Sequence, residues 1–186
     1  MMPALDWLQG NANQLGAATP SLFFWGTGIL SSVLDNAPTY LSFLSAAFGL
    51  FIDADTIRQV EQLVRTNGAG LAALSGPNAE AIRLTFETLQ KYHGAALTAG
   101  NISTEQIEIA FLLGNTRLNQ FIVAISIGAV FFGANTYIGN GPNFLVKSIA
   151  DHFQVHTPGF LGFVFKFTLP IMVPVLLVTW WMFFRG

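Results

Sequence analysis

Charged and apolar positions divide the chain into three blocks. One charged residue lies between residues 7 and 52, twelve lie between residues 53 and 117, and three lie between residues 121 and 184. Long stretches with few charges are typical of segments that contact lipid, because an unpaired charge is costly inside a bilayer. The pattern therefore predicts two membrane-embedded blocks that flank an extramembrane helical insert at residues 53–120.

The insert predicts three short amphipathic helices, each with a candidate N-cap and a candidate stop. The candidate N-caps are Asp53, Asn78 and Ser103, and Ser103 forms a capping box with Gln106. The candidate stops are Asn67-Gly68, Gly94 and Gly114-Asn115. We expect a solvated helical cap, and a regulatory or partner-binding role is the alternative.

The first apolar block, residues 21–52, is interrupted near its centre by the polar sequence Asp35-Asn36-Ala37-Pro38. Residues 21–34 give about 21 Å of α-helix, which is too short to cross a bilayer core of about 30 Å. A second run of similar length follows the interruption. Two half-length helices joined by a polar tip predict a re-entrant hairpin, although one long helix broken midway would give similar lengths.

The second apolar block begins with a predicted discontinuous transmembrane helix at residues 121–152. Its first apolar run ends at Phe132, and the sequence GANTYIGNGPN that follows contains three glycines, three asparagines and one proline. This composition does not favour a continuous helix, so we expect half a helix, an unwound segment and another half. Irregular backbone at membrane depth is tolerated only where protein or a water-filled cavity satisfies its polar groups.

The final apolar run, residues 160–184, has 25 residues and one charge, Lys166. A bilayer core of about 30 Å needs about 20 apolar residues, so this run predicts the C-terminal transmembrane helix. Pro170 and Pro174 predict a kink in that helix. At the other end of the chain, residues 1–20 are interpreted as the tail of a preceding segment and a linker.

The composition supports an all-α membrane protein and excludes other classes. Apolar residues make up 52% of the 186 residues, the mean hydropathy is +0.53, and charged residues make up 10%. Soluble domains contain roughly 25% charged residues. A net charge of −2 excludes a basic nucleic-acid surface, and the absence of cysteine excludes thiolate chemistry. We expect an integral membrane protein of the bacterial inner membrane with no nucleic-acid partner.

The two interrupted helices carry the candidate chemistry. Near the bilayer midplane, helix N-termini favour a carboxylate and free main-chain carbonyls favour a sodium ion. The candidates for substrate or ion binding are the polar residues of the two tips: Asp35, Asn36, Thr39, Asn135, Thr136, Asn140 and Asn143. The candidates that shape the backbone there are Pro38, Gly133, Gly139, Gly141 and Pro142.

Asp35 lies close to the centre of the first apolar block and is the charge found there. An ionisable residue in a membrane segment marks a cation or proton site in many transporters, and we expect that role for Asp35. A cap for the second half-helix is the alternative. The asparagine and threonine candidates also suit turns and caps, and Ser31 and Ser32 are undecided between ligand contact and a structural role.

Motifs for catalysis or for a metal site are not supported by the sequence. His152 and His156 have a spacing that metal sites use, with Asp151 beside them, but no third strong ligand follows. No arrangement of serine, histidine and aspartate suggests a hydrolase. We therefore expect a protein that is not an enzyme, with no metal and no cofactor, and with Na⁺ or H⁺ as a coupling ion.

The sequences SSVLDNAPTYLSFLSAAFG (residues 31–49) and GAVFFGANTYIGNGPNFLVKSIA (residues 128–150) resemble an ion transporter superfamily. That superfamily contains citrate carriers, arsenite pumps and NhaD-type sodium/proton antiporters, and the chain is most similar to its citrate transporter branch. The resemblance implies the second inverted repeat, or C-terminal half, of an elevator-type transporter. Its binding site would lie between two hairpin tips, here residues 35–39, and two unwound helices, here residues 135–143.

The resemblance implies secondary active transport of a small carboxylate such as citrate, coupled to a cation. Sodium/proton antiport is the alternative, and a non-transporting membrane subunit or a truncated half is the alternative from another class. The expected partners are a small anion, a monovalent cation, the lipid bilayer, and either the missing first repeat or a second copy of the chain. Because the first repeat is missing, we expect a fragment, a split gene or a truncated chain.

Overall fold

The computed structural model describes residues 18–185, and all secondary structure within that range is helical. The described chain forms two compact units. Unit 1 comprises the described parts of Met1–Ala46 and Val123–Gly186, and unit 2 comprises Ala47–Ile122. The all-α prediction is confirmed for the described residues, whereas residues 1–17 of the predicted tail lie outside them.

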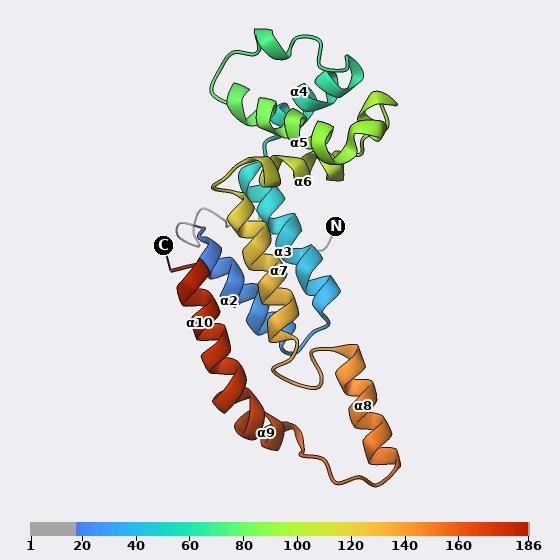
Figure 1. Cartoon of the computed structure of the whole chain (residues 1–186), viewed down its shortest axis with the longest axis vertical. Helices are drawn as coiled ribbons and strands as arrows, with labels where there is room; N and C mark the ends of the chain where they lie inside the picture. Colours follow the sequence, from blue (N-terminus) through green and yellow to red (C-terminus); the bar gives the residue numbers. More distant parts are fainter. Residues whose placement is uncertain (1–17, 186) are drawn as a thin grey trace. The chain divides into compact units, whose positions relative to one another are not determined.

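Unit 1 begins with one helix and most of a second, which are joined by a short turn. Helix α2 (Pro20–Ser31) begins after Thr19, whose Oγ1 accepts the N–H of Leu22 at 3.2 Å, and Pro20 occupies its first turn. Helix α3 (Asn36–Phe51) follows the turn, and the chain reverses its direction between the two helices (Figure 1). The 12 residues of α2 span about 18 Å, which is less than the thickness of a bilayer core.

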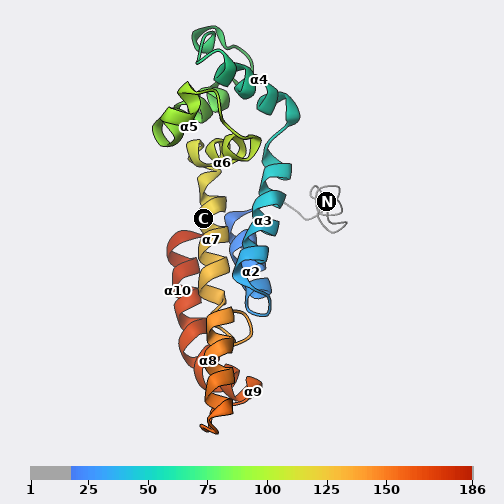
Figure 2. The same cartoon turned by 90° about the vertical axis from the view of Figure 1, so that its right-hand side faces the viewer.

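A break in the backbone separates the next two helices of unit 1. Helix α7 (Asn119–Phe132) ends before the non-helical residues 133–140, and helix α8 (Gly141–His152) begins after them. Proline in the first turn of α8 costs little, because the N–H that proline lacks would have no helical partner there. The α2–α3 turn lies beside this break in both Figure 1 and Figure 2.

Among the described residues, the last helix, Phe160–Phe183, is the one long and apolar enough by itself to cross a membrane. Its 24 residues have a mean hydropathy of 2.1 and span about 36 Å. It consists of α9 (Phe160–Phe163), a π-helical segment (Val164–Met172) and α10 (Val173–Phe183). Pro170, where the sequence predicts a kink, lies inside the π-helical segment.

A second candidate span combines α3 with α4 (Ala54–Arg65), two helices bent by 95° relative to each other. Helix α4 has one apolar face, and its opposite face carries exposed charges such as the ion pair of Asp55 with Arg58. This pattern is typical of a helix that packs on a core with one face and meets water with the other.

Helices α2 and α7 approach so closely that a glycine is required at their contact. A Cβ on Gly128 would lie 2.7 Å from the carbonyl oxygen of Phe24. The Phe24 ring is fully buried, stacks on Phe184 at 5.0 Å between ring centroids, and meets Phe132 edge-on at 5.2 Å. Small residues that allow such close backbone approach are typical of helix contacts in membranes.

Unit 2 contains three main helices and one short one. They are α4, α5 (Ala79–Thr98), α6 (Thr104–Gly114) and a 3-10 helix (Leu71–Ala73). These helices enclose an apolar core formed by Val60, Leu63, Val64, Ile82, Phe86, Leu89, Leu97, Ile107 and Ala110. Burial of one such side chain stabilises a fold by about 1.5–3 kcal/mol, so unit 2 has a source of stability that does not depend on lipid.

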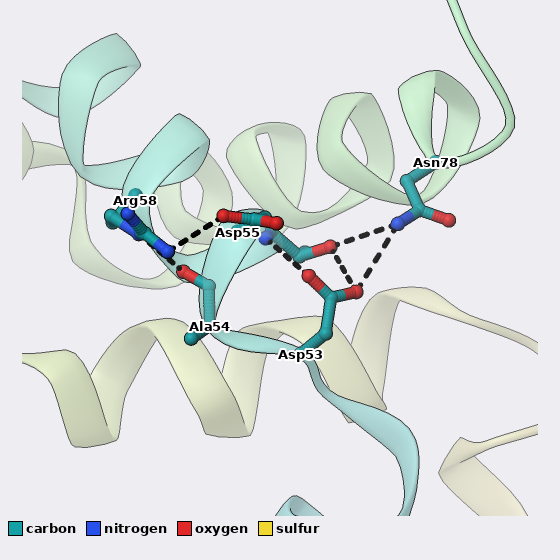
Figure 3. A network of polar contacts seen from close by, with 6 residues as sticks. Asp53, Ala54, Asp55, Arg58 and Asn78 are labelled. Carbon is teal, nitrogen blue, oxygen red and sulfur yellow. Dashed lines mark hydrogen bonds and ion pairs between the residues drawn. The ribbon is translucent and has the colours of Figure 1, made fainter.

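Two of the three predicted caps form as expected. Asp53 accepts the N–H of Thr56 at 2.8 Å and caps α4, and Ser103 with Gln106 forms the capping box of α6. Asn78 precedes α5 but does not cap it, because its amide donates to Asp53 Oδ2 at 3.2 Å and Thr56 Oγ1 at 3.1 Å (Figure 3). The Thr56 N–H, followed by the Thr56 hydroxyl, holds the pKa of Asp53 below its usual value.

Helix α5 is interrupted where the sequence predicts that it stops. The backbone leaves the helical conformation at His93 (φ −130°, ψ 28°), and this kink is followed by a second helical stretch that runs to Thr98. Leu97, beyond the predicted stop, is buried in the core of unit 2 with 4% exposure. Burial of this leucine stabilises the stretch after the kink by about 1.5–3 kcal/mol.

Candidate functional site

The candidate site lies in unit 1, where the α2–α3 turn meets the break between α7 and α8 (Figures 1 and 2). Hydrogen bonds join these two segments although the bonded residues are 98 to 104 positions apart in the sequence. The two tips that carry the sequence candidates are therefore in direct contact.

Asn36, the first residue of α3, binds the turn to the end of α7 and to the break. When the carboxamide nitrogen faces the surrounding acceptors, it lies 2.7 Å from Ser31 Oγ and 3.0 Å from the carbonyl oxygens of Ala129 and Gly139. The Ser31 hydroxyl donates onward to the Ala129 carbonyl at 2.6 Å. Asn36 thus provides donors for main-chain carbonyls that the interrupted helix does not pair.

Two glycines allow the turn and the break to approach this closely. A Cβ on Gly133 would lie 2.3 Å from the nearer end atom of the Asn36 carboxamide, and a Cβ on Gly139 would lie 2.5 Å from the carbonyl oxygen of Ser31. A Cβ on Gly141, in contrast, would have no atom within 4 Å. Gly133 and Gly139 are therefore needed for contact with the hairpin turn, whereas Gly141 marks the open start of α8.

Ser32, which follows α2, holds the other side of the break. Its Oγ accepts the amide N–H of Asn135 at 3.1 Å, and its carbonyl accepts the hydroxyl of Thr136. The Thr136 Oγ1 in turn accepts the N–H of Gly139 at 3.0 Å, which closes a turn inside the break. The two serines that the sequence leaves undecided, Ser31 and Ser32, are thus hydrogen-bonded across the contact.

Two amide oxygens of the break are buried without a hydrogen-bond partner among residues 18–185. They are Oδ1 of Asn135 and Oδ1 of Asn140. The Asn135 side chain is firmly placed, because the residue is 8% exposed and its amide nitrogen is bound to Ser32. A buried acceptor without a partner costs about 1–3 kcal/mol. Both atoms are acceptors, so the partner that suits them is a cation or a hydrogen-bond donor.

Thr168, in the last helix, is a site contact that the sequence analysis misses. Its hydroxyl donates to the main-chain carbonyl of Asn135, and its side chain is buried, with 7% exposure. A signal is present in the sequence, because Thr168 is one of three polar residues in the apolar run 160–184, together with Lys166 and Thr179. Polar residues in such runs tend to face protein or a cavity rather than lipid.

Asp35 and Thr39 form the start of α3 and lie outside this network. The Asp35 carboxylate is exposed and accepts the N–H of Asn36 at 2.8 Å. The Asp35 carbonyl accepts the hydroxyl of Thr39 at 3.0 Å, and Thr39 is buried with 1% exposure. The Asp35 carboxylate thus bonds to the N–H of the next residue, and both roles considered for Asp35, a cation or proton site and a helix cap, stay predictions. The Thr39 hydroxyl is already used in the first turn of its own helix.

The remaining sequence candidates lie at helix starts. Pro38 and Pro142 are exposed residues in the first turns of α3 and α8. Asn143 is exposed and borders a groove of about 300 Å³, together with Tyr137 and Lys147. The candidates that the structure joins in one network are Asn36, Asn135, Thr136, Gly133 and Gly139.

The histidine pair considered as a metal site forms no cluster. Within the described part of the chain, no group of three or more histidine, cysteine, aspartate or glutamate side chains is placed to hold a metal ion. Asp151, the acidic neighbour of His152, accepts hydrogen bonds from Lys147 and from Thr157, the latter at 3.1 Å. The hydrogen bond from Thr157 joins the end of α8 to the segment that follows this helix.

The chain matches a known protein family along almost its whole length. The family model described as "Putative citrate transport" matches residues 1–184. Searches of the curated proteins and of the solved structures gave no match. The matched region contains both interrupted helices, unit 2 and the last helix, so the family assignment applies to the residues that form the site.

Proposed function

Because the chain belongs to the family described as putative citrate transport, we propose that it carries part of the binding site of a secondary active transporter. The proposed substrate is a small carboxylate such as citrate, and the proposed coupling ion is Na⁺ or H⁺. The family and the apolar last helix support a transport role in a membrane. The choice of substrate class and coupling ion rests on the contacts of unit 1.

The single observation that carries the proposal is the unpaired Oδ1 of Asn135. This oxygen is buried at a backbone break, and its own amide nitrogen and main-chain carbonyl are held by Ser32 and Thr168. An acceptor fixed in this way and left without a partner is suited to a ligand that enters and leaves.

A monovalent cation suits the acceptors of the break. Oδ1 of Asn135 and Oδ1 of Asn140 are neutral oxygens, which replace the hydration shell of a cation without the strong attraction of a carboxylate. Weak retention is required in a transport cycle, because the ion must be released on the other side. We therefore favour Na⁺ as the ion that binds at Asn135.

A carboxylate substrate suits the start of α8. Asn140 occupies the N-cap position, but its side chain makes no capping hydrogen bond, so the first N–H groups of α8 remain open to a ligand. The positive end of the helix dipole points to the same place and favours an anion. Together with the unpaired amide oxygens, this arrangement supports adjacent sites for a cation and an anion.

We further propose that α2 and α3 form a re-entrant hairpin and that α7 and α8 form a discontinuous membrane helix. In support, α2 spans about 18 Å and the last helix about 36 Å, so a hairpin turn at the end of α2 would lie near mid-depth. In an elevator-type inverted repeat, a second tip and break complete the site. The proposed source is a first repeat or a second copy of the chain.

Sodium/proton antiport is the second candidate, and the exposed carboxylate of Asp35 at the hairpin turn favours it. An exposed carboxylate beside the site is able to exchange a proton for a cation. The variant Asp35→Asn keeps the shape of this side chain and removes its charge. If Asp35 carries the coupling ion or proton, this variant loses coupled transport but still inserts into the membrane, whereas wild-type uptake would exclude the role.

Uptake of labelled citrate into proteoliposomes that contain the full-length protein tests the proposed function. We expect uptake that requires an inward Na⁺ gradient or proton gradient and that falls to background when both gradients are removed. Exchange of Na⁺ for H⁺ without citrate would replace the citrate proposal with antiport. The absence of both fluxes would favour a non-transporting membrane subunit.

A further inference from the structure

We propose that Thr168 is a positioning residue that links the π-helical segment of the last helix to the ligand-binding oxygen of Asn135. The inference rests on the proposed function, because it assigns a new residue to the same site. Thr168 belongs to neither of the two interrupted helices, and its hydroxyl donates to the main-chain carbonyl of Asn135. The last helix is thereby connected to the break by a buried hydrogen bond.

The hydrogen bond of Thr168 differs from those of other threonines in the helices of this chain. A helical threonine commonly donates to the carbonyl four residues earlier in its own helix. The threonines that donate to the carbonyl four residues earlier include Thr39, Thr85, Thr88, Thr98 and Thr179. Thr168 instead donates to a residue 33 positions away in another segment. Its side chain is therefore used for a contact between segments rather than within its helix.

The π-helical segment presents Thr168 to the break. The N–H of Val173 donates to the carbonyl of Thr168, five residues earlier, which is the hydrogen-bond pattern of a π-helix. Thr168 is the buried residue of this segment, whereas Phe165 and Ile171 are 67% and 56% exposed. The segment thus buries a hydroxyl rather than its large apolar side chains. Such π-helical stretches occur frequently at functional sites.

Asn135 is held by partners on three of its polar groups. Its N–H donates to the carbonyl of Phe132 at 2.9 Å, its amide nitrogen donates to Ser32, and its carbonyl accepts from Thr168. These bonds fix the backbone and the side-chain plane, and they leave Oδ1 as the unpaired group. Loss of the Thr168 bond would free the carbonyl and relax the direction of Oδ1, which lowers affinity for a bound cation.

The test compares three variants of the full-length protein in proteoliposomes. Thr168→Val removes the hydroxyl at nearly constant volume, and Thr168→Ser restores it. Thr179→Val removes the hydroxyl of a half-buried threonine in the same helix, which donates to the carbonyl of Val175 four residues earlier. We expect Thr168→Val to raise the Na⁺ concentration for half-maximal citrate uptake about five- to tenfold, the size expected for one buried hydrogen bond. Thr168→Ser and Thr179→Val should stay within about twofold of wild type.

A measurement without transport separates this inference from the proposed function. The melting temperature of the purified full-length protein is followed against NaCl, with KCl as the ionic-strength control. We expect a Na⁺-specific increase in wild type that needs about five- to tenfold more Na⁺ in Thr168→Val. The same Na⁺ dependence in both proteins would overturn the inference, as would a wild type that shows no Na⁺ effect. Na⁺ binding without citrate uptake would leave the role of Thr168 intact and overturn only the citrate proposal.

Discussion

Two polar clusters of the molecule differ in whether their buried hydrogen-bonding groups find partners within the protein. In unit 2, Asp53, Thr56 and Asn78 bond to one another at the start of α4. In unit 1, Asn135 is also buried, yet its Oδ1 has no partner among residues 18–185. Self-satisfied polar groups stabilise local structure, whereas a buried and unsatisfied one costs stability. The difference separates a structural cluster from a candidate binding site.

The two units also differ in how completely their apolar side chains are buried. Unit 2 encloses its apolar side chains in a core of its own. In unit 1, large apolar side chains such as Val146, Leu161 and Phe165 are 66–67% exposed. Exposed apolar area of this extent is typical of a surface that faces lipid or another membrane segment. Unit 2 thus buries its apolar side chains by its own packing, whereas unit 1 leaves many of its apolar side chains exposed.

The largest expected effect is on the core of unit 2. Leu89→Ala removes a fully buried side chain and should destabilise unit 2 by about 2–5 kcal/mol. Amide hydrogen exchange in α4, α5 and α6 should therefore become at least about 30-fold faster. Leu113→Ala, at a leucine of α6 with 41% exposure, is the control. Unchanged exchange in Leu89→Ala would contradict an independent core.

The next largest effect is on the contact between the turn and the break. In Gly139→Ala, the new Cβ meets the carbonyls of Ser31 and Ser32, which are main-chain atoms and cannot move aside easily. We expect a cost of about 1–3 kcal/mol at this contact and at least about tenfold slower citrate uptake. Gly159→Ala, outside the site, places its Cβ in open space and should transport like wild type. Equal rates for the two variants would show that the close approach is not needed.

A smaller effect is expected at the cap of α4. The pKa of Asp53 is lowered from its ordinary value of 3.8, so its contribution is present above pH 3.8 and is lost as the pH falls through the lowered value. Asp53→Ala should destabilise α4 at neutral pH by about 1 kcal/mol. Hydrogen exchange in α4 at pH 6 and pH 3 measures this loss.

The matched control for the cap is Asp55→Ala, which removes a first-turn carboxylate and its surface ion pair with Arg58 but no capping hydrogen bond. Exposed pairs of this kind contribute about 0–1 kcal/mol. If both variants accelerated amide hydrogen exchange in α4 equally at pH 6, the capping hydrogen bond of Asp53 would not stabilise α4 more than the surface ion pair does.

The smallest effect is expected at Glu108 in α6. Partial burial, and then repulsion from Glu105, raise the pKa of Glu108 above its ordinary value of 4.5. The ionised form is therefore disfavoured in the folded state, and the resulting loss of stability develops as the pH rises above 4.5. Glu108→Gln should stabilise unit 2 at pH 7 by up to about 0.5 kcal/mol and have no effect near pH 3. A stabilisation that is equal at both pH values would show that the ionised Glu108 carboxylate is not the cause.

Local features of the fold could be predicted from the sequence. The capping box of Ser103 and Gln106 involves residues three positions apart, so its geometry follows from the sequence spacing. The apolar length of the last helix follows from hydropathy in the same way. Gly94 marked the kink of α5 at His93, but the helical stretch that follows and buries Leu97 was not predicted.

Contacts between distant segments could not be predicted from the sequence. The two tips were identified by their polar composition, but their pairing depends on how α2 packs against α7. Thr168 was missed because its partner Asn135 is 33 positions away and because the π-helical segment changes which residues face inward. Asp35 was the leading candidate on charge alone, and the structure leaves it exposed beside the network.

The central claim is that Oδ1 of Asn135 binds the coupling cation, and one comparison of variants tests it most directly. Asn135→Ala removes the oxygen and the bond to Ser32, whereas Ser32→Ala removes the same bond and keeps the oxygen. The measurement is the Na⁺ concentration that gives half-maximal citrate uptake by the full-length protein in proteoliposomes. We predict an increase of at least about tenfold in Asn135→Ala and a clearly smaller one in Ser32→Ala. Equal increases in the two variants would contradict the claim.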